Sequence, residues 1–267
     1  MSEFVRIECL GPEVNIEFDW VARHNPGTLL VFLHEGLGSL AMWRGFPQAL
    51  CEAAGCRGLV YSRPGYGRSS ALWPDRQWPL DFMHIEAREI LPRVLTALEI
   101  DTTIDPPVLL GHSDGASIAL LYASMHPEQV SGIVAMAPHI MVEAVTVKSI
   151  AKIRDEFLCG DLPVRLGKYH SDVQSVFWGW ATVWLHPKFP DWDIRSRLSA
   201  IKCPLLLIQG LDDQYGSMAQ VDGLLAALPM AAAMKLRHCA HSPHIDQAVA
   251  VTEAIGHFLL ALRLGVQ

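Results

Sequence analysis

The segment Gly111–Gly115 (GHSDG) places a serine, Ser113, in the pattern G-x-S-x-G. A short apolar run precedes this segment and a helix-like run follows it, which predicts a sharp turn from a strand into a helix. Gly111 and Gly115 fit such a turn because larger side chains there would collide with the adjoining strand and helix. The helix start also offers backbone N–H groups to an oxygen that becomes negative nearby. The pattern therefore predicts that Ser113 is a nucleophile.

A serine hydroxyl is a weak nucleophile near neutral pH and needs a neutral imidazole to accept its proton. The chain contains 12 histidines, of which His238, His241 and His244 lie close together near its end. A carboxylate must orient the imidazole, and the adjacent Asp212 and Asp213 follow an apolar run. These residue types suit attack on a carbonyl through a covalent acyl intermediate that water then hydrolyses.

Short apolar runs that predict buried strands alternate with longer helical patterns, which is typical of an α/β fold with a mainly parallel sheet wrapped by helices. The predicted strands are residues 28–34, 58–62, 107–111, 132–137, 204–210 and 232–238. A helix is predicted to begin near Gly115, directly after the candidate nucleophile, and a closing helix is predicted over 248–262.

This alternation stops over residues 142–198, where helical periodicity continues without a convincing strand. The stretch contains four tryptophans, Trp178, Trp180, Trp184 and Trp192. An aromatic-rich helical insertion predicts a lid, with Trp178 and Trp184 as substrate contacts; the alternative is a set of extra packing helices with tryptophans in the core. The predicted organisation is a core domain of 1–141 and 199–267 and a helical lid of 142–198.

The motifs resemble the α/β-hydrolase family from the first strands to the last helix, and the order Ser…Asp…His matches the order of its catalytic triad. The resemblance implies an eight-stranded, mainly parallel sheet flanked by helices, with a helical lid inserted after the sixth strand. It also implies that the triad lies on loops at the carboxyl edge of the sheet.

The run from Cys239 to Gln247 resembles the family segment G-H-S-P-H-x-E-Q-P, whose first histidine is the base. This resemblance implies that His241 is the base and that His244 supports the loop. Ala240 stands where the family has glycine. The family pattern G-x-x-D, set against the segment GLDD at residues 210–213, favours Asp213 as the acid, with Asp212 as the alternative.

The segment HEGLGS at residues 34–39 stands where the family has H-G-x-x-G, a loop that donates one N–H to the oxyanion. The resemblance assigns this donor to Gly36, and the nucleophile turn assigns a second donor to the N–H of Asp114. Glu35 replaces the usual glycine. It is expected either to bring a carboxylate beside the substrate or to turn away and bond neighbouring backbone.

Two further residues bear on the substrate. His139 follows the predicted strand 132–137 and is expected at the carboxyl edge of the sheet, either facing substrate or bonded at the strand end. Asp114 resembles the aspartate of the G-x-S-D-G turn in amino-acid ester hydrolases, which holds a substrate amine; local bonding within the turn is the alternative.

The predicted reaction is hydrolysis of a carboxylic ester with a small to medium, apolar or aromatic acyl group, in the manner of a carboxylesterase. Alternatives are a thioesterase, a lactonase, or a carbon–carbon bond hydrolase of meta-cleavage products, although HEGLGS departs from the H-G-x-G-P-G segment of the last class. A ligand-binding receptor on the same fold is the alternative outside enzymes.

The composition of the chain limits the partners and cofactors that it is expected to bind. The net charge is -7 and apolar residues make up 51%, which gives no reason to expect nucleic acid or an anionic membrane. No metal-ligand spacing, dinucleotide fingerprint or P-loop is present, so no cofactor is expected. The six cysteines are scattered, and the first residues lack the pattern of a signal peptide, which predicts a cytoplasmic protein with reduced thiols.

Overall fold

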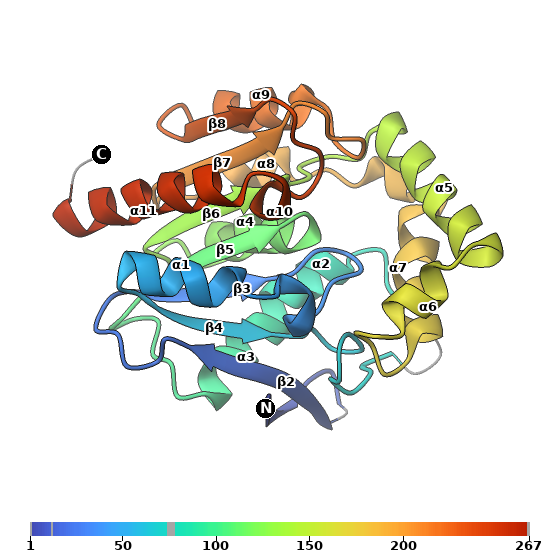
Figure 1. Ribbon diagram of the computed structural model, residues 1–267, viewed down its shortest axis with the longest axis horizontal. Helices are drawn as coiled ribbons and strands as arrows, with labels where there is room; N and C mark the ends of the chain where they lie inside the picture. The colour runs from blue at the N-terminus through green and yellow to red at the C-terminus, as the bar shows by residue number, and fades with distance from the viewer. Residues whose placement is uncertain (1, 12, 74–77, 266–267) are drawn as a thin grey trace.

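The computed structural model describes residues 2–11, 13–73 and 78–265 (Figure 1). Within these residues eight strands form one sheet in the order β1-β2-β4-β3-β5-β6-β7-β8. The strands are β1 (Glu3–Glu8), β2 (Glu13–Val21), β3 (Leu29–Leu33), β4 (Arg57–Tyr61), β5 (Val108–His112), β6 (Gly132–Met136), β7 (Leu205–Gly210) and β8 (Ala232–Leu236). Strands β1, β2 and β4 pair antiparallel, and every other pairing is parallel. The predicted α/β fold with a mainly parallel, eight-stranded sheet is confirmed.

The central strands β3, β5, β6 and β7 are buried along their whole length. Strands covered on both faces read as continuous apolar runs, and all six predicted strands start and end within two residues of the observed bounds. Strands β1 and β2 are different because they lie at the antiparallel end of the sheet and mix charged with apolar residues. The residue pattern did not identify them individually.

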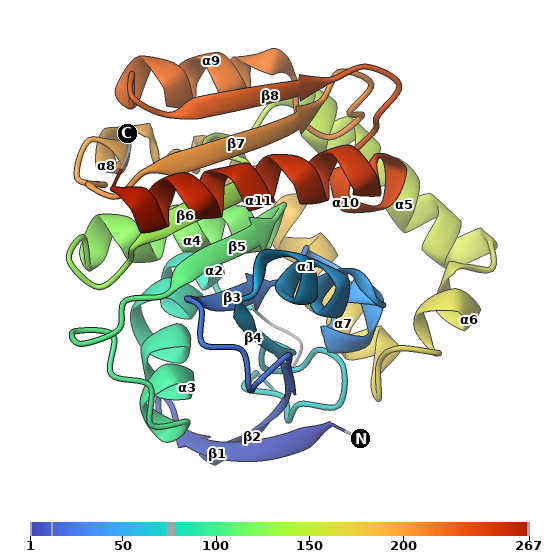
Figure 2. The same cartoon turned by 60° about the vertical axis from the view of Figure 1, so that its left-hand side comes forward.

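Helices cover both faces of the sheet (Figures 1 and 2). Alternate residues of the central strands pack with α1 (Phe46–Ala54) and α11 (Ala248–Leu264) on one face. The other residues pack with α3 (Leu91–Ala97), α4 (Asp114–Met125) and α9 (Met218–Ala227) on the opposite face. The short helix α2 (Phe82–Ile85) and the π-helical turn η2 (Glu86–Ile90) lead directly into α3. This three-layer packing holds the carboxyl ends of the parallel strands at one edge.

The segment after β6 is helical, as predicted. It contains α5 (Ala144–Cys159), α6 (Leu162–Leu166), α7 (Val173–Trp184), the 3-10 turn η3 (Phe189–Asp191) and α8 (Arg195–Leu198). Helices α5, α6 and α7 lie together to one side of the sheet, beyond the strand ends (Figure 1), whereas α8 packs against α4 and α9 of the core.

The segments at the two ends of this insertion pair with each other. Met141 and Asp193 form an isolated antiparallel bridge, and the Ile194 N–H donates to the carbonyl of Ile140 at 2.9 Å. The insertion therefore leaves and rejoins the core at neighbouring points. Among the described helices none is both long and apolar enough to cross a membrane.

Candidate active site

Ser113 occupies a strained turn between β5 and α4, with φ 53° and ψ −120°. The positive φ is unfavourable for a serine and persists only when surrounding structure enforces it. Both flanking glycines are required by close packing: a Cβ on Gly111 would lie 2.4 Å from the carbonyl oxygen of Gly115, and one on Gly115 would lie 1.9 Å from that of Leu33. The turn predicted from the G-x-S-x-G spacing is present.

Three side chains from distant parts of the sequence form a hydrogen-bonded chain at this turn. The Oγ of Ser113 lies 2.9 Å from Nε2 of His241. The Nδ1 of the same ring lies 2.8 Å from Oδ2 and 3.0 Å from Oδ1 of Asp213. Ser113 follows β5, Asp213 follows β7 and His241 follows β8, so parallel strands deliver all three to one edge of the sheet. This arrangement is the one that nucleophilic catalysis by serine requires.

The carboxylate of Asp213 is buried and heavily hydrogen-bonded, with a side chain only 1% exposed. It accepts hydrogen bonds from the N–H of Tyr215 and from Nε2 of Gln209, both at 2.7 Å. Burial raises the pKa of Asp213, but the hydrogen bond and charge of His241 and these other donors outweigh it and hold the pKa below its usual value. The group is therefore ionised and can orient the imidazole.

The other candidates for the acid and the base lie away from Ser113. Asp212 is exposed, and its backbone N–H donates to the carbonyl of Cys239. His238 is exposed as well. His244 is buried against Trp43, with ring centroids 4.9 Å apart, which agrees with a role in supporting the loop. Of the alternatives left open by the sequence, the structure brings only Asp213 and His241 to Ser113.

A cavity of about 260 Å³ lies beside Ser113, and the two predicted oxyanion donors border it. The N–H of Asp114 is at the start of α4, where a helix supplies no internal acceptor. The N–H of Gly36 has no acceptor among the residues that the structure describes. Both groups are thus free to donate to an oxygen in the cavity.

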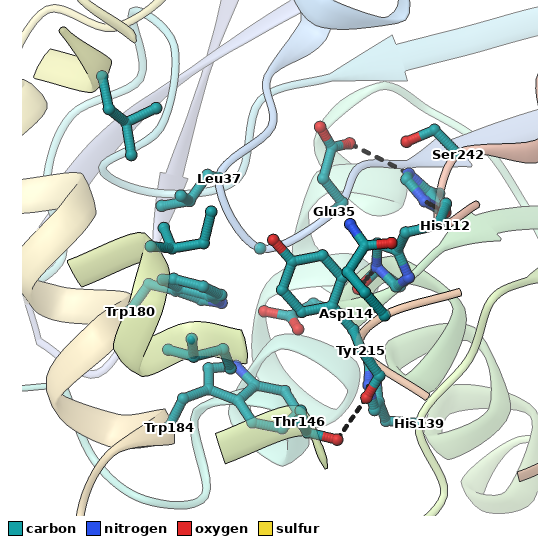
Figure 3. A pocket seen from close by; sticks show the side chains of 17 residues that line it. Glu35, Leu37, His112, Asp114, His139, Thr146, Trp180, Trp184, Tyr215 and Ser242 are labelled. Carbon is teal, nitrogen blue, oxygen red and sulfur yellow. Dashed lines mark hydrogen bonds and ion pairs between the residues drawn. The ribbon is translucent and has the colours of Figure 1, made fainter. Parts of the chain in front are cut away.

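The insertion supplies the apolar wall of the cavity (Figure 3). Its contributions are Ile150 and Ile153 from α5, Leu162 from α6, and Trp180 and Trp184 from α7. The prediction for Trp184 is therefore supported by its position. Trp180 was among the tryptophans noted in the sequence but was not selected as a contact, although its i, i+4 spacing to Trp184 places the two on one helix face.

The expectation for Trp178 is wrong, since this side chain does not line the cavity. Its Nε1 donates to Oε1 of Gln174 at 3.1 Å, and its ring lies edge-on to Phe177 and Phe157. Successive helical residues are rotated by about 100°. A residue two positions before Trp180 therefore faces away from the side that Trp180 and Trp184 share.

Trp180 fits tightly against the Gly36 loop. A Cβ on Gly36 would lie 2.1 Å from Nε1 of Trp180. The absence of a side chain at position 36 thus lets the insertion approach the oxyanion loop closely.

Glu35 borders the cavity with its carboxylate directed to His112 (Figure 3). Its Oε2 lies 3.4 Å from Nδ1 of His112, and the side chain is 26% exposed. Backbone bonding is only part of the environment of Glu35, because its carboxylate also contacts the side chain of His112. Gly38 makes room for it: a Cβ there would lie 2.6 Å from Oε2 of Glu35.

His139 lies in the cavity wall, as expected from its place after β6. It is 2% exposed, and its Nε2 lies 3.3 Å from the carbonyl oxygen of Tyr215. Burial, reinforced by the neighbouring His241, lowers the pKa of His139 to about 4. His139 is therefore a neutral wall residue that is bonded at the strand end.

The side chain of Asp114 is buried beside Trp184 (Figure 3). Its Oδ2 has no hydrogen-bond partner among the described residues. Burial raises the pKa of Asp114 to about 6, against the opposing charge of Arg63. Local bonding within the turn leaves Oδ2 unsatisfied, and the indole N–H of Trp184 beside the carboxyl opposes this rise in its pKa.

No group of three or more histidine, cysteine, aspartate or glutamate side chains within the described ranges is arranged to hold a metal ion. The residues that border the cavity are suited to polar and apolar contacts with an organic molecule.

Comparisons with known proteins agree with this fold. The chain is 24% identical over 266 residues to a pimeloyl-[acyl-carrier protein] methyl ester esterase of Aeromonas hydrophila, covering 90% of this chain and 98% of that protein. A thermophilic esterase from Thermogutta terrifontis superposes with a TM-score of 0.73 at 17% identity, over 98% of this chain and 99% of that one. The enol-lactonase of Burkholderia xenovorans LB400 superposes with a TM-score of 0.72 at 20% identity, over 96% of this chain and 99% of that one.

The family described as alpha/beta hydrolase fold matches residues 28–169, which is more than half of the chain. This range includes the Gly36 loop and the Ser113 turn, and the sheet order and strand directions observed here extend the same fold to the last helix. The chain is therefore an alpha/beta hydrolase, a member of the family that its motifs resemble.

Proposed function

We propose that this protein is a serine esterase that hydrolyses a carboxylic ester with a small to medium, apolar or aromatic acyl group. The observation that carries the proposal is the chain from Ser113 through His241 to Asp213, with contacts of 2.9 and 2.8 Å, beside an apolar-walled cavity. The esterase relatives support the same reaction class.

In the proposed mechanism, the Oγ of Ser113 forms a bond to the ester carbonyl carbon while its proton moves to Nε2 of His241. The carbonyl oxygen becomes negative and accepts hydrogen bonds from the N–H groups of Gly36 and Asp114. Collapse of this intermediate breaks the bond to the alcohol, which leaves with the proton from His241. Water then attacks the acyl-enzyme by the same steps and releases the acid and free Ser113.

The volume and the lining of the cavity support the proposal of a small to medium, apolar or aromatic acyl group. Its volume of about 260 Å³ suits a small molecule, and its wall from the insertion is aliphatic and aromatic. We assign residues 142–198 the role of a lid because α5, α6 and α7 all contribute to this wall. Burying an apolar acyl group here supplies about 25 cal/mol per Å² of removed surface.

A panel of substrates tests the reaction class. Initial rates are measured with p-nitrophenyl acetate, butyrate and benzoate, a matched butyryl thioester, an aliphatic lactone and a vinylogous diketone. The proposal expects the p-nitrophenyl esters to give the largest kcat/KM, with a trapped acyl-enzyme visible by mass spectrometry. Preferred turnover of the thioester, lactone or diketone would replace the ester assignment, and binding without turnover would indicate a receptor.

A further inference from the structure

Both ring nitrogens of His112, the residue before Ser113, face hydrogen-bond acceptors. Nε2 lies 2.6 Å from the main-chain carbonyl oxygen of His241, and Nδ1 lies 3.4 Å from Oε2 of Glu35. A carbonyl oxygen can only accept, so Nε2 must carry a proton. An ionised carboxylate also only accepts, so a hydrogen bond from Nδ1 to Glu35 requires a second proton and makes the ring an imidazolium.

The packing around His112 and Glu35 brings their side chains together. His112 is 1% exposed at the end of β5, and Glu35 reaches it from the loop after β3 because Gly38 has no side chain in the way. A buried charge is costly unless it is paired and hydrogen-bonded. Here each partner supplies the compensation that the other needs.

We propose that Glu35 and His112 form a carboxylate–imidazolium pair that positions the base His241 through its main-chain carbonyl. This inference rests on the proposed function, since it assigns two positioning residues to the same site. His241 is then held at three points: by His112 at its carbonyl, by Asp213 at Nδ1 and by Ser113 at Nε2.

The surrounding titratable groups agree with a cationic His112. His241 and His244 face it with ring centroids 5.2 and 4.9 Å away, and the carboxyls of Asp213 and Asp114 act on it through their charge. Burial opposes the charge on His112, but the hydrogen bond and charge of Glu35 outweigh it and raise its pKa. Burial and the charge on His112 lower the pKa of His244 to about 3, so His244 stays neutral.

Ionisation of Glu35 is favoured in turn. Burial raises its pKa, but the hydrogen bond and charge of His112 outweigh that effect and hold the pKa well below its ordinary value. Both pKa shifts therefore favour the charged forms of the two partners. The glycine of the family pattern could not provide this contact, so the pair depends on the glutamate in HEGLGS.

Nitrogen-15 NMR of the histidine side chains tests the charge state directly. At pH 8 the wild-type protein is expected to show His112 with both nitrogens protonated, whereas Glu35→Gln, which keeps the shape but not the charge, should show a singly protonated ring. Assignment uses the variant His112→Gln, in which the His112 signals disappear. A singly protonated His112 in the wild type at pH 8 would overturn the proposal, whether or not the protein hydrolyses esters.

Kinetics test the positioning role. Misplacing a catalytic group by about 1 Å costs on the order of 100-fold in rate. Glu35→Gln is expected to lower kcat for p-nitrophenyl butyrate by about 10- to 100-fold with KM nearly unchanged. The control Glu52→Gln removes an exposed carboxylate on α1 and should leave kcat unchanged. Unchanged kcat in a folded Glu35→Gln variant would refute the positioning role.

Discussion

At the scale of single residues, the candidate site depends on which of two adjacent aspartates meets His241. The side chain of Asp213 is buried and contacts Nδ1 of the imidazole, while Asp212 is exposed. The nucleophile could be predicted from sequence because the G-x-S-x-G turn has a steric cause, whereas the order Ser…Asp…His was recognised from the family resemblance. Choosing between neighbouring carboxylates depended on family spacing, because sequence alone does not say which side chain points inward.

Exchanging each aspartate for asparagine tests this assignment. Asp213→Asn keeps the shape but loses the charge that stabilises protonated His241, and kcat is expected to fall by about 10³- to 10⁴-fold. Asp212→Asn is the matched control and should retain nearly full activity. Initial rates with p-nitrophenyl butyrate provide the measurement, and the opposite ranking of the two variants would contradict the assignment.

His112, which the sequence does not single out, contacts residues that only folding brings close to it. His112 occupies the variable position before Ser113, and its partner Glu35 is separated from it by 77 positions. The Glu35 departure from the family pattern was visible, but a residue type says nothing about which distant side chain it meets. Predicting the pair required the register of β3 beside β5.

At the scale of elements, the face of helix α7 decides which tryptophans meet a substrate. Trp180 and Trp184 border the cavity, while Trp178 lies against Phe177 and Phe157. The central strands could be predicted almost to the residue because continuous burial makes them continuous apolar runs. Helix faces were harder to predict where apolar residues surround the helix, as in the run VFWGWATVW of α7.

Alanine substitutions on the two faces of α7 test this division. Trp180→Ala enlarges the cavity and removes apolar contact, so kcat/KM for p-nitrophenyl butyrate is expected to fall by about 10- to 100-fold. Trp178→Ala removes the same side chain from the other face and should change kcat/KM by less than about 3-fold. Thermal unfolding of both variants checks that each is folded. Equal losses in kcat/KM would show that the assigned faces are wrong.

At the scale of the whole molecule, the layered core also buries a carboxyl group away from the reacting residues. Glu86, in η2, is 0% exposed, and neither carboxyl oxygen has a hydrogen-bond partner within the described part of the chain. Burial outweighs the charge of Arg63 and raises the pKa of Glu86 to about 7. Sequence patterning could predict the layers of the fold but not a buried glutamate, because charged residues are normally read as surface.

This raised pKa makes stability depend on pH. Folded Glu86 keeps its proton up to about pH 7, whereas the unfolded group loses it near its ordinary pKa of 4.5. Its contribution to the free energy of unfolding is therefore largest below pH 4.5 and is lost as pH rises through 7. The Glu86→Gln side chain does not titrate, so the variant lacks this pH-dependent loss. The free energy of unfolding of the variant minus that of the wild type should therefore rise by up to about 3 kcal/mol between pH 4.5 and 8. Urea unfolding at both pH values measures the difference, and a pH-independent difference would contradict the prediction.

The role of Ser113 as nucleophile is tested by comparing the wild type with Ser113→Ala in the release of p-nitrophenol from p-nitrophenyl acetate and butyrate. The account predicts steady turnover by the wild type and a loss of at least about 10³-fold in Ser113→Ala, because no other group supplies the attacking oxygen. Circular dichroism confirms that the variant is folded. Full activity in Ser113→Ala would contradict the assignment of the nucleophile and the mechanism built on it.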